Sequence, residues 1–259
     1  MAETQIGVDF DGAIAIVTFS RPEKLNAFDL AMLGQLEAAC NEVEANPSVR
    51  AMVITGSGKA FSAGGDIKAW ATMSAPEFGH SWVRFGHRVF SRLAGVRVPV
   101  IAALNGHALG GGLELAAAAD FRIAESQIKL GLPETGLGMV PGWSGTQRLV
   151  RRFGAQMVRR MALGGEVFTA AEGVQLGLVD QVVETGGSRD AALAYARRVA
   201  GRGPAATEIA KLMIAVADGE DNGAAVEALG AILAAKTADL KEGVAAFSEK
   251  RAPQFKGDW

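Results

Sequence analysis

Three glycine-rich segments carry residues whose types and spacing could do chemistry. In the segment from Asn105 to Leu115, the glycines at 110–112 precede an alanine-rich helical pattern, and Glu114 lies three residues after Gly111. The first turn of a helix presents unpaired N–H donors, and glycine lets a ligand oxygen approach that backbone closely. The segment therefore predicts an anion-binding helix start beside a carboxyl group. The alternative is that the glycines allow close helix–strand packing and that Glu114 is an ordinary charge at a helix start.

The other two segments flank this one in the sequence. Residues 59–68 follow a β-type run, and the pair Gly64 and Gly65 allows a sharp turn that points N–H groups at a ligand. Residues 132–149 hold two prolines, four glycines between 136 and 145, and one acid, Glu134. Constrained loops of this kind often build sites. For residues 59–68 the alternative is a plain strand-to-helix turn. For residues 132–149 it is a rigid surface loop with a solvated carboxylate.

Composition narrows the class of protein. Glycine contributes 33 of the 259 residues, close to twice the usual share of ~7%. The net charge of −2 argues against a nucleic-acid binder. The single cysteine, Cys40, excludes an intrachain disulfide and is expected as a small buried side chain within a helix. His80, His87 and His107 lack a metal-ligand spacing, so no metal site is expected, and no signal-peptide pattern is visible, so the cytoplasm is the expected compartment.

The elements that must position these segments form an α/β pattern. Apolar residues at helical spacing over 29–44 predict a helix. Predicted strands occupy residues 13–19, 51–55, 99–104, 121–124 and 178–183. Because strands alternate with helices, a layered α/β core is expected. The stretch from 188 to 251 has no convincing strand and predicts helices that pack on that core or on a neighbouring chain.

The order and spacing of the three segments resemble the crotonase (enoyl-CoA hydratase/isomerase) superfamily, and most of all its enoyl-CoA hydratases. The resemblance covers nearly the whole chain, from RPEKLNA at 21–27 to FSEKR at 247–251. It implies a crotonase-like layered core of repeated strand-strand-helix units, with a CoA-thioester site, over residues 1–187. It also implies a C-terminal helical trimerisation subdomain over residues 188–259, and hence a homotrimer or a homohexamer built as a dimer of trimers.

The resemblance also implies a reaction, the reversible hydration of a 2-enoyl-CoA to a 3-hydroxyacyl-CoA. The amides of Gly65 and Gly111 would form an oxyanion hole for the thioester carbonyl, and each such donor typically contributes on the order of 10²–10³ in rate. Adding water across the C2–C3 double bond needs a group that takes a proton from water and a group that supplies one to C2. We assign the first role to Glu114 and the second to Glu134. The Gly142 amide matches a position that helps to hold the water.

Coenzyme A is expected as part of the substrate, with no permanently bound cofactor and no nucleic-acid or membrane partner. The resemblance places the adenine against the backbone near Ala63 and Ile67, and Lys24, Lys59 and Lys68 are candidates for its phosphates. An ordinary solvated charge is the alternative for any single lysine. The complete set of positions implied for coenzyme A is Lys24, Leu25, Ala27, Lys59, Ala63, Gly65, Asp66, Ile67, Lys68, Gly111, Phe247 and Lys250, of which the last two would reach it from an adjacent subunit.

Two departures from the family pattern bear on the substrate. Trp143-Ser144 stands where many family hydratases carry Ala or Gly followed by Gly. Trp143 either reshapes the acyl pocket or points away into the core. Thr135 is smaller and more polar than the aliphatic residue common at its position. The sequence does not decide whether four aromatic residues line the acyl pocket or pack in the core: Trp70, Phe78, Trp82 and Phe85.

Other functions of the same scaffold remain alternatives at this point. They are double-bond isomerisation, decarboxylation, thioester hydrolysis and dehalogenation of an acyl-CoA. The pair Glu114 and Glu134 discriminates among them, because isomerases often keep only one such acid and dehalogenases use a different nucleophile. A catalytically silent CoA-binding or RNA-binding relative is a further alternative, against which stand both acids, both glycine loops and the slight negative charge.

Overall fold

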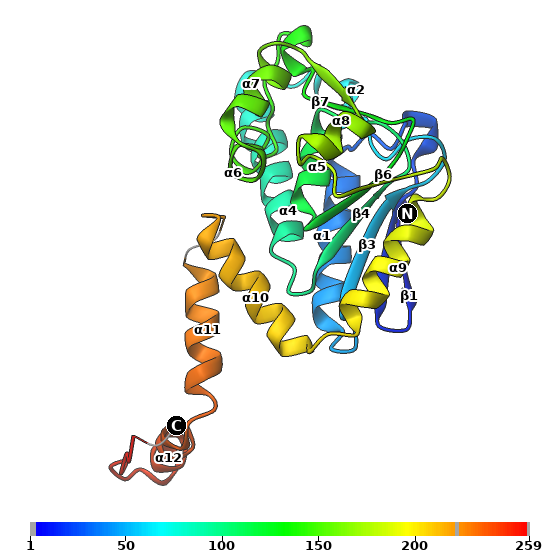
Figure 1. The fold of residues 1–259 in the computed structure, drawn as a ribbon. Helices are drawn as coiled ribbons and strands as arrows, with labels where there is room; N and C mark the ends of the chain where they lie inside the picture. The colour runs from blue at the N-terminus through cyan, green and yellow to red at the C-terminus, as the bar shows by residue number, and fades with distance from the viewer. Residues whose placement is uncertain (1–3, 221–222, 258–259) are drawn as a thin grey trace. The chain divides into compact units, whose positions relative to one another are not determined.

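The computed structural model describes residues 4–220 and 223–257, and its first part is built on a six-stranded sheet (Figure 1). The strand order is β1-β2-β3-β4-β6-β9, in which β1 is antiparallel to β2 and the remaining neighbours are parallel. The strands are β1 (Ile6–Asp11), β2 (Ile14–Phe19), β3 (Ala51–Gly56), β4 (Val100–Leu104), β6 (Phe121–Glu125) and β9 (Gln181–Val183). A smaller sheet, in the order β5-β7-β8, contains β5 (Ala108–Leu109), β7 (Lys129–Gly131) and β8 (Val167–Thr169).

Helices connect the strands in the order that the sequence pattern predicts. The α-helices of the first part are α1 (Leu30–Ala45), α2 (Ile67–Trp70), α3 (Ala75–Glu77), α4 (Arg84–Ala94), α5 (Gly111–Ala118), α6 (Arg148–Phe153), α7 (Ala155–Ala162), α8 (Ala170–Gln175) and α9 (Ser188–Ala200). Short 3₁₀ turns occupy η1 (Pro22–Lys24) and η3 (Glu134–Leu137), and a π-helical stretch, η2 (Phe78–Val83), precedes α4. The runs β1-β2-α1 and β4-β5-α5 are strand-strand-helix units, so the predicted fold class is confirmed.

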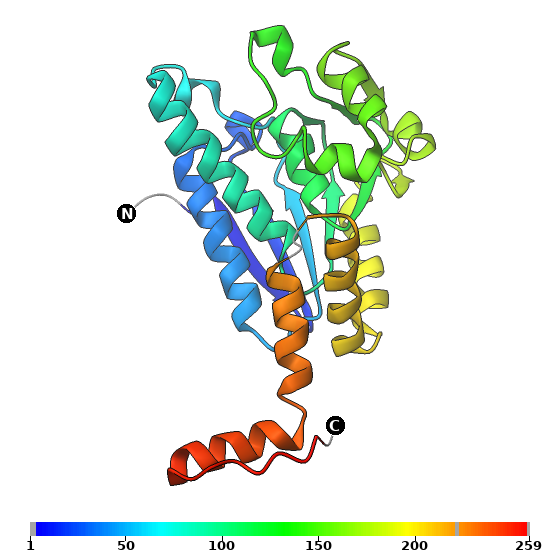
Figure 2. The ribbon, with the colours of Figure 1, turned by 90° about the vertical axis from the view of Figure 1, so that its left-hand side faces the viewer.

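Both faces of the large sheet are covered by helices, which explains its continuous apolar strands. Along β3, Met52 and Ile54 belong to the larger hydrophobic core, which also contains the buried faces of α1, α4 and α5. Ala51 and Val53 point the other way and pack with α9. Figure 2 shows α1 and α4 running side by side along one face of the sheet. Alternate residues of the strand thus pack into two separate hydrophobic cores, one on each face of the sheet.

Helix α1 confirms the helix that the apolar spacing over 29–44 predicts. Its N-cap Asp29 accepts a hydrogen bond from the amide of Met32 at 2.8 Å, which satisfies one of the unpaired donors of the first turn. The predicted Cys40 lies on its buried face. The helix therefore begins one residue after the predicted start and buries the apolar stripe that the spacing indicated.

The chain divides into two compact units, residues 1–208 and 209–259, and the division falls inside α10 (Pro204–Ala217). The sequence boundary at 187/188 falls earlier than this, because α9 packs on the sheet and belongs to the first unit. The second unit continues with α11 (Ala224–Ala234) and α12 (Ala238–Glu249). Its role in trimerisation stays a prediction. Within residues 4–220 and 223–257, no helix combines the length and the apolar character needed to cross a membrane.

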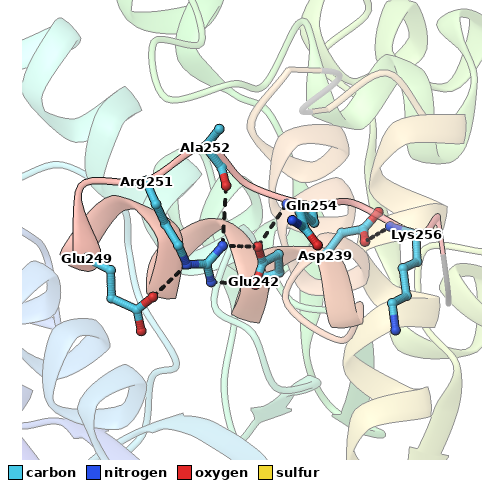
Figure 3. Close-up of polar contacts among 7 residues, drawn as sticks. All are labelled: Asp239, Glu242, Glu249, Arg251, Ala252, Gln254 and Lys256. Carbon is cyan, nitrogen blue, oxygen red and sulfur yellow. Dashed lines mark hydrogen bonds and ion pairs between the residues drawn. The ribbon is translucent and has the colours of Figure 1, made fainter.

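Within the second unit, the C-terminal tail folds back along α12 (Figure 3). The guanidinium of Arg251 donates to Glu242 and to Glu249, and the amide of Gln254 donates to Glu242 at 2.8 Å. These bonds lower the pKa of Glu242 to about 2. The amide of Lys256 also donates to Asp239 at 2.9 Å. The tail is thereby tied to the helix by charge-assisted hydrogen bonds.

An ion pair joins the turn after β2 to the first glycine-rich segment. Arg21 Nη1 lies 2.9 Å from Asp66 Oδ2 and donates to the carbonyl of Ala27 at 2.8 Å. The side chains of Arg21 and Asp66 are only 13% and 11% exposed. Asp66 also caps α2 by accepting from the amide of Lys68. The pair therefore fixes where the glycine turn lies relative to residues 21–28.

We expect Arg21→Ala to lower the free energy of unfolding by about 3 kcal/mol, because it leaves the buried Asp66 carboxylate without its cation. Urea denaturation measures the change. The control is Glu23→Ala, which removes a 3.9 Å contact to Arg21 from a side chain that is 66% exposed. That variant should cost at most about 1 kcal/mol. Equal losses in the two variants would contradict a structural role for the Arg21–Asp66 pair.

Candidate active site

The glycine turn at 64–65 is held in place by backbone pairing with the segment after η1. The amide of Phe28 donates to the carbonyl of Gly64 at 2.7 Å, and the amide of Asp66 donates to the carbonyl of Phe28 at 2.8 Å. Gly65 therefore sits in an isolated β-bridge with Phe28. Because Phe28 is fully buried, this bridge anchors the turn to the core.

The start of α5 lies directly against this turn. Ser62 forms a β-bridge with Ala108, just before α5. A Cβ atom on Gly64 would lie 2.7 Å from the amide nitrogen of Gly111, and Gly64 has φ +88°. Glycine is therefore required at position 64 both for its conformation and for the close approach. The two glycine-rich segments, far apart in the sequence, meet as one structure.

The amides of Gly65 and Gly111 have no hydrogen-bond acceptor among the residues that the structure describes. Both residues line the same cavity. Gly111 is the first residue of α5, where the backbone N–H groups have no partner within the helix. The structure thus brings together the two predicted donor residues at a surface that a ligand can reach.

Glu114 lies in the first turn of α5 and is buried, with 2% of its surface exposed. Its Oε1 atom accepts hydrogen bonds from the amide of Trp143 at 2.8 Å and from the amide of Gly145 at 2.6 Å. A Cβ atom on Gly145 would lie 2.6 Å from that oxygen, so a side chain there would collide with the carboxylate. Two backbone donors of the loop therefore orient Glu114, a contact that the sequence analysis did not foresee.

A side-chain contact supports the same loop. Ser144 has φ +82°, in the left-handed region where glycine is favoured, and is 2% exposed. Its hydroxyl lies 3.1 Å from Nδ1 of His87 on α4. Burial, followed by the positive charges of Arg148 and Arg151, lowers the pKa of His87. The imidazole of His87 thus contacts the loop at Ser144, between the two residues whose amides bind Glu114. The departure from the family pattern at Ser144 was the sequence feature that could have indicated this contact.

Glu134 opens η3 and faces the start of α5. Its two carboxylate oxygens are buried and have no hydrogen-bond partner among the described residues. A Cβ atom on Gly110 would lie 3.1 Å from Oε1 of Glu134, and Gly110 has φ +55°. A buried carboxyl group without partners inside the protein marks a site rather than a structural contact. The alternative of a solvated surface carboxylate is therefore wrong for Glu134.

Burial changes the proton affinity of both acids. It raises the pKa of Glu114 from its ordinary value of 4.5 to about 8, with a further increase from the nearby Glu134 and an opposing effect of the two amide hydrogen bonds. Burial also raises the pKa of Glu134. The Glu114 carboxyl group can therefore hold a proton near neutral pH, and the pKa of Glu134 is shifted in the same direction. Shifts of this kind are typical of groups that act in acid–base catalysis.

The two acids and the two glycines line one cavity of about 850 Å³, together with Gly142. On the side of η2 and α4 the lining combines apolar side chains with histidines and arginines. Trp70, Phe78, Trp82 and Phe85, which the sequence left between pocket and core, all line it. Trp143 lines it as well, although only 3% of its surface is exposed. The hydroxyl of Thr135 instead donates to the carbonyl of Ala162 at 2.7 Å.

The positions implied for coenzyme A are only partly gathered at the cavity. Ala63, Gly65, Ile67 and Gly111 line it. Asp66 is engaged by Arg21, and Phe247 and Lys250 belong to the second unit. The remaining residues of the set do not line the cavity. They are the exposed Lys24, Leu25, Lys59 and Lys68 and the buried Ala27. The contacts of all these residues with coenzyme A stay predictions.

We expect Glu114→Gln to become more stable relative to the wild type as the pH rises from 5 to 9. The unfolded chain ionises Glu114 near 4.5, whereas the folded chain ionises it near 8. The wild type therefore loses the stability of the protonated form as the pH rises through this window, and glutamine does not. Melting temperatures at each pH measure the difference, with Glu42→Gln on the exposed face of α1 as control. A difference that falls with pH would contradict the raised pKa.

Comparisons with known proteins agree with this geometry. The family model described as enoyl-CoA hydratase/isomerase matches residues 9–258. A crotonyl-CoA hydratase from Syntrophomonas wolfei is 38% identical over 98% of this chain and 99% of its own length. A short-chain-enoyl-CoA hydratase from Clostridium acetobutylicum is 38% identical over 93% of each chain. The crystal structure of an enoyl-CoA hydratase from Bacillus anthracis superposes with a TM-score of 0.81 at 34% identity, covering 98% of this chain and 100% of that one.

The match to the family model spans residues 9–258, which include all three glycine-rich segments, so it does not rest on one motif. The chain belongs to the enoyl-CoA hydratase/isomerase family.

Proposed function

We propose that this protein catalyses the reversible hydration of a 2-enoyl-CoA to a 3-hydroxyacyl-CoA. The observation that carries the proposal is the presence, in one cavity, of two carboxyl groups whose burial raises their pKa and of two glycine amides that have no acceptor among the described residues. The relatives that are named as hydratases of crotonyl-CoA and of short-chain enoyl-CoA support the substrate class. Coenzyme A enters as part of the substrate.

In this proposal the thioester carbonyl accepts hydrogen bonds from the amides of Gly65 and Gly111. Negative charge grows on that oxygen as the enolate forms, and the positive end of α5 adds to the stabilisation. The donors need no reorganisation during the reaction, because the turn is held by Phe28 and α5 by its own hydrogen bonds. The adenine is placed near Ala63 and Ile67, both of which are exposed at the edge of the cavity.

The two acids handle the protons on the adjacent carbons. Glu114 reacts in its carboxylate form, which the amides of Trp143 and Gly145 stabilise. It accepts a proton from water while the water oxygen adds to C3, and the electron pair of the C2–C3 double bond moves toward the thioester. Glu134 then donates its proton to C2, and the steps reverse in dehydration. We assign the holding of this water to the amide of Gly142, a residue that lines the cavity in the loop that orients Glu114. Because neighbouring carboxyls share protons, their apparent pKa values belong to the pair.

A homotrimer or a dimer of trimers is part of the same proposal. Leu240, Val244 and Phe247 on α12 are 45%, 58% and 86% exposed, which is unusual for large apolar side chains and supports a partner surface. In that assembly Phe247 and Lys250 would reach the coenzyme A of an adjacent subunit.

We expect the protein to remove the ultraviolet absorbance of the enoyl thioester when it is mixed with crotonyl-CoA, because hydration destroys the conjugation between the double bond and the carbonyl. Absorbance at increasing enzyme concentration measures this. No loss at high enzyme concentration, with longer 2-enoyl-CoAs also unchanged, would reject the hydratase assignment. A gain of absorbance from a 3-enoyl-CoA would instead favour an isomerase.

Glu134→Gln should lower kcat by about 10²–10⁴ with little change in KM, since glutamine keeps the shape but has no proton to give in the transition state. Steady-state kinetics with crotonyl-CoA separate the two constants. Glu172→Gln, on an exposed capping glutamate of α8, is the matched control. A change confined to KM would refute the role assigned to Glu134.

A further inference from the structure

The indole of Trp143 fills the space between three glycines at the centre of the cavity wall. A Cβ atom on Gly111 would lie 2.9 Å from Cε3 of the indole, and one on Gly65 would lie 3.3 Å from Cη2. A Cβ atom on Gly86 of α4 would overlap Nε1. The ring therefore spans the gap from the two oxyanion glycines to α4, and Gly86 is the residue that makes room for it.

Other aromatic rings hold the indole in this position. The ring of Trp143 lies 5.3 Å from that of Trp82 and 5.1 Å from that of Phe90, measured between centroids. Trp82 and Phe90 are themselves 3% and 0% exposed. The backbone amide of Trp143 also donates to Glu114. The indole is thus a packed wall whose position is tied to the position of the catalytic carboxylate.

This wall limits where an acyl chain can go. A thioester carbonyl bound by Gly65 and Gly111 has the indole immediately beside it, so the acyl chain cannot enter the buried space between Gly86 and Phe90 that the ring fills. The open part of the cavity is lined instead by η2, by residues of α4 and by the loop that carries Leu137 and Val140, which are 64% and 67% exposed. Additional methylene groups on this open side keep more contact with water, and gain less from burial, than they would in the closed space that the indole occupies.

We propose that Trp143 is a specificity-determining residue that closes the acyl pocket next to the reacting carbons and makes the protein selective for short acyl groups. This inference rests on the proposed function, because it assumes that an acyl thioester binds at Gly65 and Gly111. Trp143 sets the depth of the pocket, and Gly86 permits the indole to occupy it.

Trp143→Ala tests the inference, because it removes the indole and keeps the backbone amide that orients Glu114. The ratio of kcat/KM for 2-decenoyl-CoA to that for crotonyl-CoA should rise about tenfold or more, and Trp143→Phe should give a smaller rise. The affinity ratio of decanoyl-CoA to butanoyl-CoA, measured by calorimetry, should rise in the same order. Binding of these saturated thioesters requires no turnover, so the inference can be tested even if the wild type hydrates no enoyl-CoA.

Gly86→Ala provides the reciprocal test. The added methyl group forces the indole toward Gly65, so kcat/KM for crotonyl-CoA should fall about tenfold or more. Combining Gly86→Ala with Trp143→Ala should restore most of the activity that Gly86→Ala loses, because the methyl group then enters vacated space. Additive losses would show that the two residues do not share this volume and would overturn the inference.

A general loosening of the core is excluded by Phe19→Leu, a substitution of a buried ring that does not line the cavity. This control should lower the melting temperature without changing either ratio. An unchanged chain-length ratio in folded Trp143→Ala would overturn the proposal, as would an equal rise in Phe19→Leu. If Trp143→Ala does not fold, Trp143→Phe and Gly86→Ala decide the question, with their folding checked by circular dichroism.

Discussion

The site depends on the contact between the carboxylate of Glu114 and two backbone amides of the loop that follows η3. Trp143 and Gly145 both donate to the same oxygen, at 2.8 and 2.6 Å. This contact ties α5 to a loop some thirty residues later in the chain. It also partly offsets the cost of burying a carboxyl group, because backbone donors stabilise its charged form. If the loop moved, the carboxylate of Glu114, the backbone of Gly142 and the indole of Trp143 would move together.

Close approach of backbones explains three of the glycines at the site, Gly64, Gly111 and Gly112. Gly64 touches the amide of Gly111, and a side chain at Gly112 would overlap the carbonyl of Ser62. Two chain segments can meet this closely only where side chains are absent. The consequence is chemical, because the amides of Gly65 and Gly111 then open onto one cavity instead of being covered by their own side chains. Part of the remaining space is taken by the indole of Trp143.

Several features of the site oppose stability. Glu134 keeps two buried oxygens without a partner among the described residues, Glu114 has a strongly raised pKa, and Ser144 adopts a left-handed backbone conformation. Backbone strain and unpaired polar groups of this kind persist only where the surrounding structure is stable enough to hold them in place. They concentrate at functional sites. Here the Arg21–Asp66 pair, the Phe28 bridge and the aromatic packing around Trp143 provide that surrounding support.

The sequence alone determined the α/β class, because apolar runs over 51–55 and 99–104 and the helical stripe over 29–44 arise from local periodicity. The glycine motifs and both acids could also be identified from the sequence, because the order and spacing of the three segments are specific. The edge strand β1 and the short β5, β7 and β8 were missed, because a half-exposed or two-residue strand leaves no period to read. Only the tertiary structure decided the partners of Glu114, the placement of α9 on the sheet and the volume filled by Trp143. Each of these depends on which distant segments lie in contact, and spacing along a chain does not carry that information.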